Sequence, residues 1–314
     1  MRHRRLALID MGTNTFHLLI VELPEARHTE PLVLLRTKVG VRLGEGGISK
    51  GEITPEAFAR ALHTLNAFQE EIELHQVTEV RATATSAVRV ARNGPELVQA
   101  IFEQTGIKVD VIPGEREAEL IATGVRQAVP LGQEKSLIVD IGGGSVECII
   151  ADEATISWKQ SFEIGAQRLL DMFFPDPSGI MPAAAVAAQQ AHLSTVLAPL
   201  TAAIQHHQPV TLVGASGSFD SLADMQLGQL RTEAELPPCT ELALSSFQSS
   251  YRHLLSGNHE QRTAIPGILP MRADMLVVAS VLIDYVLGIS GITRLRTSSF
   301  ALKEGLLAEM MKVE

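Results

Sequence analysis

Cysteine, positive charge and long apolar runs are all scarce in this chain of 314 residues. The two cysteines, Cys148 and Cys239, lie far apart without a metal-ligand spacing, which excludes a disulfide framework and a zinc site. The formal net charge of −10 argues against nonspecific binding of nucleic acid, although a polyanionic substrate needs only local positive potential. Near the N-terminus, Asp10 interrupts the apolar run LALI, so we expect no signal peptide. No run is expected to span a membrane, and a cytoplasmic location follows as an expectation.

The hydrophobic content of 46% is enough for a sizeable core, and the length suits two domains. We expect a first domain at residues 1–126 and a second at 127–298. A terminal helix at about 299–314 is expected to pack back on the first domain.

The most informative stretch is SLIVDIGGGSVECIIAD, residues 136–152. It predicts a buried strand that carries Asp140, a turn of three glycines and Ser145, and a second strand that begins at Val146. A dinucleotide fold or a P-loop would continue from the glycines into a helix instead. Glycines let several backbone N–H groups converge on an anion, and an aspartate beside them can bind a hard cation. A tight hairpin without a ligand is the alternative.

A second copy of this pattern, LALIDMGTNTFHLLIV, lies 130 residues earlier. Asp10 aligns with Asp140, Gly12 with Gly142, and Thr15 with Ser145. Thr13 and Asn14 take the places of Gly143 and Gly144. The duplication predicts two related domains that face each other across a cleft, each with one turn on a phosphate-bearing ligand.

Other elements are expected from periodicity and from turn residues. We predict strands at 33–43, 77–85, 107–112, 155–162, 211–213 and 292–295, and helices at 55–74, 183–206, 240–255, 271–287 and 301–312. Antiparallel strands at the start of the chain favour a mixed sheet. Thr54 is the expected N-cap of the helix at 55–74.

Three charged side chains stand out as candidates for a site. Arg42 precedes a glycine-rich turn. Arg89 lies one helical turn after small hydroxyl residues, so it is either a phosphate contact or only a surface charge. Glu117 shares a helix face with Leu120 and Ile121, so it is either a buried structural acid or a general base. In a nucleotide-using enzyme the turn VGASGS at 213–218 would lie near the base or ribose; the alternative is a tight strand-to-helix turn.

Together these pieces resemble the exopolyphosphatase and guanosine pentaphosphate phosphohydrolase family, within the actin, Hsp70 and sugar-kinase superfamily. The matching segments run in order along nearly the whole chain: DMGTNTFHLLIVE, VRLGEGG, ATSAVRVARN, GEREAELIATGV, DIGGGSVE, IGAQRLLD, VGASGS, MRAD and SSFALKEGLL. Val146 departs from the usual threonine. The resemblance implies an α/β fold with duplicated ribonuclease H-like domains, mixed sheets and a cleft between them.

The resemblance also implies roles for individual residues. Glu117 would be the catalytic base, and Asp140 and Glu147 would be the acids that hold Mg²⁺ or another divalent cation, with Asp10 as a further candidate. The turns Gly12–Thr15 and Gly142–Ser145 would bind phosphate, and Arg42 and Arg89 would line the same site. A homodimer is implied in the same way.

The expected reaction is hydrolysis of the terminal phosphoanhydride of inorganic polyphosphate, with guanosine pentaphosphate as the alternative substrate. The expected partners therefore exclude nucleic acid and membranes. Two readings from other classes stay open: an ATP-dependent kinase or ATPase, and a non-catalytic sensor of polyphosphate or of an alarmone.

Overall fold

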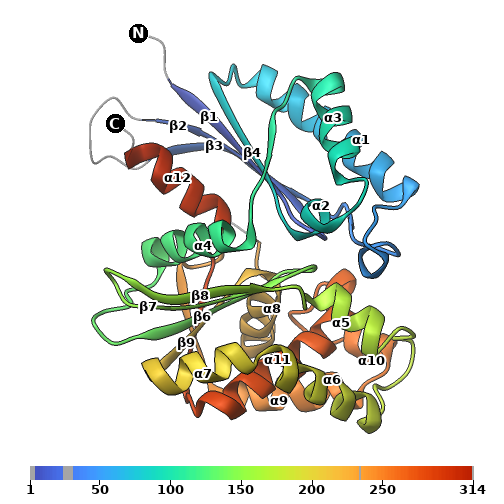
Figure 1. The fold of residues 1–314 in the computed structure, drawn as a ribbon, viewed down its shortest axis with the longest axis vertical. Coiled ribbons are helices and arrows are strands. Elements are labelled where there is room, and N and C mark those ends of the chain that lie inside the picture. Colours follow the sequence, from blue (N-terminus) through green and yellow to red (C-terminus); the bar gives the residue numbers. More distant parts are fainter. Residues whose placement is uncertain (1–3, 24–30, 233–234, 313–314) are drawn as a thin grey trace. The chain divides into compact units, whose positions relative to one another are not determined.

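The computed structural model describes residues 4–23, 31–232 and 235–312 (Figure 1). The chain divides into two compact units. The first unit comprises residues 1–116 and 309–314, and the second comprises residues 117–308. The predicted domain boundaries, 1–126 and 127–298, stay a prediction.

The first unit contains a five-stranded mixed sheet in the order β3-β2-β1-β4-β5. Its elements are β1 (Arg5–Met11), β2 (Phe16–Glu22), β3 (Leu32–Val39), the 3-10 helix η1 (Ile48–Lys50), α1 (Pro55–Leu74), β4 (Glu79–Ala84), α2 (Ser86–Val90), α3 (Gly94–Thr105) and β5 (Val109–Val111). β1 pairs antiparallel with β2 and parallel with β4. Helices α1 and α3 lie side by side against this sheet (Figure 1).

The second unit repeats this order as β8-β7-β6-β9-β11 and adds β10 at the edge. Its elements are β6 (Ser136–Ile141), β7 (Val146–Ala151), β8 (Ile156–Phe162), α5 (Ala166–Phe173), α6 (Ala183–Val196), α7 (Ala198–His207), β9 (Thr211–Ala215), α8 (Ser216–Leu227), β10 (Cys239–Leu242), α9 (Leu244–Ser256), α10 (His259–Thr263), η3 (Pro270–Arg272), α11 (Ala273–Ser290) and β11 (Arg294–Ser298). The first three strands are again antiparallel and the next two parallel. The duplicated mixed α/β sheet predicted from the 130-residue repeat is therefore confirmed.

Two helices contain residues of both units: α4 (Gly114–Ala128) and α12 (Leu302–Lys312). Within the second unit they approach closely, because a Cβ on Gly305 of α12 would lie 1.9 Å from the carbonyl oxygen of Leu120 in α4. Helix α4 is also bound to the second sheet, through an ion pair between Glu119 and Lys159 and through Arg126, which donates to the Asp152 carbonyl at 3.0 Å. These contacts fix α4 on one face of that sheet, with α7 and α11 on the other (Figure 1).

Each sheet has its own hydrophobic core. In the second unit every residue of β6 and β7 is buried, as expected for central strands covered on both faces. Helix α11 contributes the apolar centre of this core. The segment Pro270–Ser290 is also long and apolar enough to span a membrane, which corrects the expectation that no such run exists. Its apolar window is 61% buried inside the fold, as in the core helix of a globular domain.

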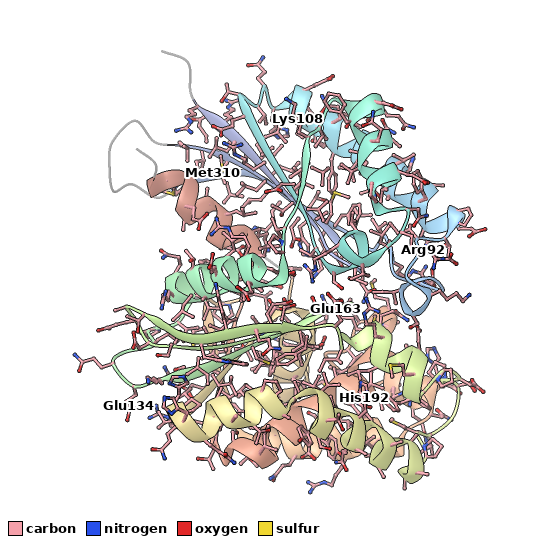
Figure 2. All side chains as sticks on the ribbon, viewed as in Figure 1. Arg92, Lys108, Glu134, Glu163, His192 and Met310 are labelled. Atoms are coloured by element: carbon pink, nitrogen blue, oxygen red, sulfur yellow. The ribbon has the colours of Figure 1, made fainter. Side chains whose placement is uncertain are left out.

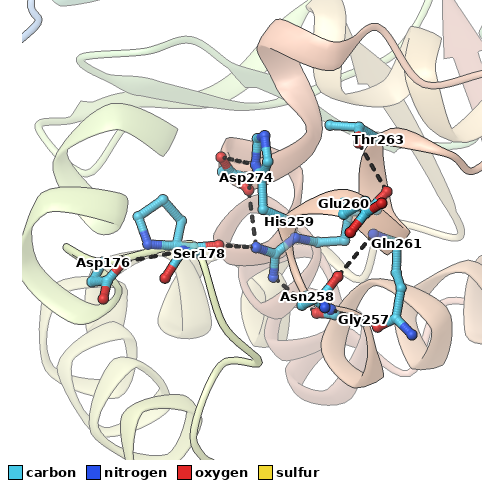
Figure 3. A network of polar contacts seen from close by, with 11 residues as sticks. Asp176, Ser178, Gly257, Asn258, His259, Glu260, Gln261, Thr263 and Asp274 are labelled. Carbon is cyan, nitrogen blue, oxygen red and sulfur yellow. Dashed lines mark hydrogen bonds and ion pairs between the residues drawn. The ribbon is translucent and has the colours of Figure 1, made fainter.

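The loop that follows α5 is fastened by a buried arginine (Figure 3). Arg262 is fully buried and donates to the Pro177 carbonyl and, at 3.0 Å, to the Asp274 carboxylate. Asp274 also accepts from His259 at 2.9 Å, and the His259 amide donates to the Ser178 carbonyl. A charged guanidinium needs such partners when it is buried, so this network joins the loop to α10 and α11.

Three of the expected elements are wrong in their bounds. The strand expected at 33–43 ends at Val39, and Arg42 has a left-handed backbone with φ of 50°. The helix expected at 183–206 is broken between α6 and α7, because Pro199 lies in the first turn of α7 and cannot continue α6. The helix expected at 240–255 begins only at Leu244, since Cys239–Leu242 forms β10 on the edge of the sheet. Helix α1 and its N-cap, Thr54, are confirmed.

Candidate active site

The glycine turn between β6 and β7 is held from one side by the start of α5. The Gly142 amide donates to the Ser145 carbonyl at 3.0 Å, which closes the turn. The carbonyls of residues 142, 143 and 144 then accept from the amides of residues 166, 167 and 165, at 2.9 to 3.0 Å. Arg168 also donates to the Gly144 carbonyl at 2.9 Å, and pairs with Glu163, labelled in Figure 2. The backbone of the turn is therefore fixed before any ligand binds.

This arrangement leaves one side of the turn rich in amide donors. In a trans peptide the carbonyl and the following N–H point in opposite directions. Since three successive carbonyls are directed at α5, the N–H groups of Gly143, Gly144 and Ser145 are directed away from it. Successive amides on one side of a turn can bind an anion such as a phosphate.

The turn of the first unit has the same construction with a different support. The Gly12 amide donates to the Thr15 carbonyl at 3.1 Å. The carbonyls of Thr13 and Asn14 accept from the amides of Gly44 and Arg42, at 3.0 and 2.8 Å. The N–H groups of Asn14 and Thr15 are consequently directed away from the 42–44 loop.

One side chain of this first turn is a good candidate for a ligand contact. The hydroxyl of Thr13 is buried and has no hydrogen-bond partner among the described residues. A buried hydroxyl without a partner is costly. A phosphate oxygen at this turn would remove that cost.

Two buried acids of the second unit, Asp140 and Glu147, lie in one row across the sheet. Asp140 on β6 is directly opposite Glu147 on β7, and Glu147 is opposite Ser161 on β8. Directly opposed residues point to the same face of a sheet. The Ser161 hydroxyl donates to Glu147 Oε1 at 2.7 Å. Asp140 is 5% exposed and Glu147 is 1% exposed, so both carboxylates are buried.

The pKa values of Asp140 and Glu147 are both raised, because burial and neighbouring acids disfavour the ionised carboxylate. Burial is the main cause that raises the pKa of Asp140 to about 6. The Ser216 side chain acts to lower this pKa, and repulsion from Asp220 acts to raise it. Burial also raises the pKa of Glu147 well above its usual range, and repulsion from Glu117 and Asp140 raises it further. Hydrogen bonds from Ser161 and Ser145 act in the opposite direction. Clustered buried acids of this kind are typical of functional sites.

This donor set fits a hard divalent cation that is completed by other oxygens. Within residues 4–23, 31–232 and 235–312, no group of three His, Cys, Asp or Glu side chains could hold a metal ion by itself. Mg²⁺ is commonly bound through one or two carboxylates together with waters and substrate phosphates. Asp140 and Glu147 beside the glycine turn match that requirement, and their mutual repulsion would be relieved by a cation.

The equivalent row in the first unit is different. At the 130-residue offset the partner of Asp10 is His17, which lies directly opposite it, and His17 is in turn opposite Lys38. Glu147 thus has no acidic counterpart in the first unit. The duplication gave both units a turn, but only the second has the pair of carboxylates.

The other predicted residues divide between the two units. Glu117 is 7% exposed on the buried face of α4, as its helical spacing predicted, and lies within electrostatic reach of Glu147. Arg42 forms an exposed ion pair with Glu45 at 3.3 Å. Arg89 donates to the Ile112 carbonyl at 3.1 Å. The roles predicted for all of these residues stay predictions.

Sequence reasoning missed the residues that support the site. Ser161 is a strand residue whose role depends on the register with β7, which no local pattern reveals. Gly165 allows α5 to contact the turn, since a Cβ there would lie 2.4 Å from the Gly143 carbonyl carbon. Ser216 lies in the predicted turn VGASGS, and its side chain acts to lower the pKa of Asp140.

Known proteins resemble this chain over nearly its whole length. It is 43% identical to an exopolyphosphatase from Cytophaga hutchinsonii, with a TM-score of 0.93 over 99% of this chain and 98% of that one. A Ppx/GppA enzyme from Aquifex aeolicus has the same fold at 21% identity, with a TM-score of 0.80 over 98% of this chain and 100% of that one.

A longer relative is the guanosine-5'-triphosphate,3'-diphosphate pyrophosphatase of Photobacterium profundum, which is 31% identical over 308 residues. The alignment covers 97% of this chain, but the chain spans only 59% of that protein's length. The profile of the Ppx/GppA phosphatase family matches residues 22–314. This chain therefore belongs to the Ppx/GppA phosphatase family.

Proposed function

We propose that this protein hydrolyses the terminal phosphoanhydride of inorganic polyphosphate and releases phosphate. The observation that carries the proposal is the likeness over the full chain to the exopolyphosphatase of Cytophaga hutchinsonii, at 43% identity. The paired turns and the buried acids are the groups that this chemistry requires.

Glu117 is the proposed general base. It lies near the start of α4 and is buried, within reach of the charge on Glu147. Water is a weak nucleophile at neutral pH, and a positioned carboxylate accepts its proton during attack.

The turns at Gly142–Ser145 and Gly12–Thr15 are proposed to bind the phosphates through their backbone amides. Asp140 and Glu147 would hold Mg²⁺, with Asp10 as a further candidate. The cation would neutralise charge on the transferred phosphoryl group. Arg42 and Arg89 are proposed to contact the rest of the polyanion, because guanidinium groups bind phosphate oxygens well.

Guanosine pentaphosphate is the second candidate substrate. The 31% identical relative from Photobacterium profundum is named for activity on such a nucleotide, and hydrolysis of a 5′ terminal phosphate is the same reaction. A cytoplasmic location and a homodimer complete the proposal, and cell fractionation and sedimentation would test them.

Phosphate release tests the proposal directly. Short polyphosphate, long polyphosphate and guanosine pentaphosphate are compared in Mg²⁺, with wild-type protein and the Glu117→Gln variant. We expect release from polyphosphate, and a loss on the order of 10²–10⁴-fold in Glu117→Gln with unchanged folding. The matched control is Glu115→Gln, on the exposed side of the same helix, which should keep full activity.

Three outcomes would contradict the proposal. Full turnover by Glu117→Gln would remove the assignment of the base. Phosphorylation of an added acceptor by ATP would favour a kinase, and saturable binding of polyphosphate without release would favour a sensor.

A further inference from the structure

Two charged side chains of helix α4 are bound to the hairpin formed by β7 and β8. Glu119 forms an ion pair with Lys159 on β8, and Arg126 donates to the Asp152 carbonyl at 3.0 Å. Glu119 and Arg126 are seven residues apart, which is close to two helical turns, so they lie on the same side of α4. Since β8 is an edge strand, this side of the helix is held at the edge of the second sheet.

The opposite side of α4 carries Glu117 and packs toward α12. Glu117 lies two residues before Glu119, which corresponds to about 200° around the helix axis. Gly124, seven residues after Glu117, lies on the same side as Glu117. A Cβ on Gly124 would lie 2.0 Å from the Ala301 carbonyl oxygen and 3.0 Å from the Gly305 amide nitrogen. Helix α4 is therefore held between the hairpin on one side and the start of α12 on the other.

Strand β8 contacts both the helix of the proposed base and one of the buried acids. Lys159 and Ser161 are two residues apart on β8, so their side chains lie on the same face of the sheet. Ser161 donates to Glu147 at 2.7 Å, while Lys159 pairs with Glu119. Burial and then repulsion from Glu117 raise the pKa of Glu147, so the Glu117 carboxylate lies within electrostatic reach of this row.

The two contacts with the hairpin lie at different distances from the proposed base. With a rise of about 1.5 Å per residue, Glu119 lies about 3 Å along the helix axis from Glu117, and Arg126 lies about 14 Å from it. The side chain of Lys159 is 22% exposed and that of Glu119 is 40% exposed, so water has only partial access to the pair. The ion pair with Lys159 is therefore the contact that holds the part of α4 around Glu117.

We propose that Lys159 is a positioning residue, whose ion pair with Glu119 holds Glu117 where it can accept a proton from the attacking water. This inference rests on the proposed function, because it assumes that Glu117 is the general base. Lys159 acts through α4 and contributes to the rate of the chemical step. Binding of phosphate and of the cation depends instead on the turns and on Asp140 and Glu147.

Substitutions of the two partners separate positioning from folding. Lys159→Met removes the charge and keeps a long apolar stem, Lys159→Arg keeps the ion pair, and Glu119→Gln removes the acidic partner. The matched control is Lys135→Met, which removes a half-buried lysine of the same unit that contacts His207 at 3.2 Å. Thermal unfolding, followed by the fluorescence of Trp158, the single tryptophan, checks that each variant folds.

The readouts are kcat and KM for phosphate release in Mg²⁺, and hydrogen exchange of α4. We expect Lys159→Met to lower kcat on the order of 10-fold at unchanged KM, since a displacement of about 1 Å can cost up to about 10²-fold. Amides at 117–122 should exchange about 2- to 5-fold faster, as the loss of a partly exposed ion pair allows, while those of β6 stay protected.

Glu119→Gln should reproduce both effects, and the double variant of Lys159→Met with Glu119→Gln should be no worse than either single one, because the two side chains act as a pair. Lys159→Arg and Lys135→Met should behave as the wild type does.

A wild-type kcat in Lys159→Met would overturn the role of Lys159 and leave the proposed function intact. A lower melting temperature with unchanged kcat would also overturn it, in favour of a purely structural ion pair. Losses that add up in the double variant would overturn it as well, because the two side chains would then act independently. If the wild-type protein releases no phosphate from either proposed substrate, the proposed function is wrong and this inference falls with it.

Discussion

Replacing Asp140 by asparagine should stabilise the metal-free protein. Burial raises the pKa of this carboxyl to about 6, from 3.8 for an unperturbed aspartate. The folded state therefore holds the proton more tightly than the unfolded state does. Since one pKa unit corresponds to about 1.4 kcal/mol, ionised Asp140 destabilises the metal-free fold by about 3 kcal/mol at pH 8.

The pH dependence has a definite sign. The stability associated with protonated Asp140 is fully present below pH 3.8 and is lost as the pH rises through about 6. Asparagine stays neutral and has nearly the same shape as aspartate. The Asp140→Asn variant should therefore exceed the wild type by up to about 3 kcal/mol at pH 8, and by only about 1 kcal/mol at pH 4.5.

Urea unfolding in EDTA, followed by the fluorescence of Trp158 between pH 4.5 and 8.5, measures this difference. The matched control is Glu153→Gln, an exposed acid of the same unit, which should show no comparable gain. The reasoning is refuted if Asp140→Asn is less stable than the wild type at pH 8, or if the difference between them does not narrow at low pH. Loss of Mg²⁺-dependent activity in the more stable variant would show that the site is built at the expense of stability.

Two further substitutions test the support of the site. Ser161→Ala removes the donor that lies 2.7 Å from Glu147 Oε1. This variant should bind Mn²⁺ about 10- to 100-fold more weakly, as measured by electron paramagnetic resonance. Unchanged affinity would exclude a supporting role for Ser161. Gly165→Ala places a Cβ 2.4 Å from the Gly143 carbonyl carbon, so α5 or the turn must shift. We expect this variant to have a lower melting temperature and to bind phosphate more weakly. In the control Gly179→Ala the added Cβ has no described heavy atom within 4 Å, and equal effects of the two variants would contradict the packing argument.

The sequence by itself predicted the repeated architecture, for local reasons. Strand, turn and returning strand are encoded by neighbouring residues, so two copies at one offset predicted two mixed sheets and the equivalence of Asp10 and Asp140. The burial of Glu117 also follows from local rules, because helical spacing places it on the apolar face of α4. Helix α1 could be bounded because Thr54 and Pro55 mark its start.

The predicted bounds of helices and strands were wrong where contacts with residues distant in the sequence determine the local conformation. Cys239–Leu242 is a strand because the edge of β11 is available to it, although the sequence around it favours a helix. Arg42 leaves the strand conformation because its amide bonds to the Asn14 carbonyl, 28 residues earlier in the chain. Such contacts join segments that no local window contains.

Only the tertiary structure decided which groups make up the site. The register of β6, β7 and β8 brings Ser161 to Glu147, and the register of β6 and β9 places Ala215 directly opposite Asp140. Neither depends on residues that are close in sequence. The raised pKa values have the same origin, because they depend on how deeply a carboxyl is buried and on which charges surround it. Sequence patterns determine which residues can do the chemistry, whereas packing determines their neighbours and their charge.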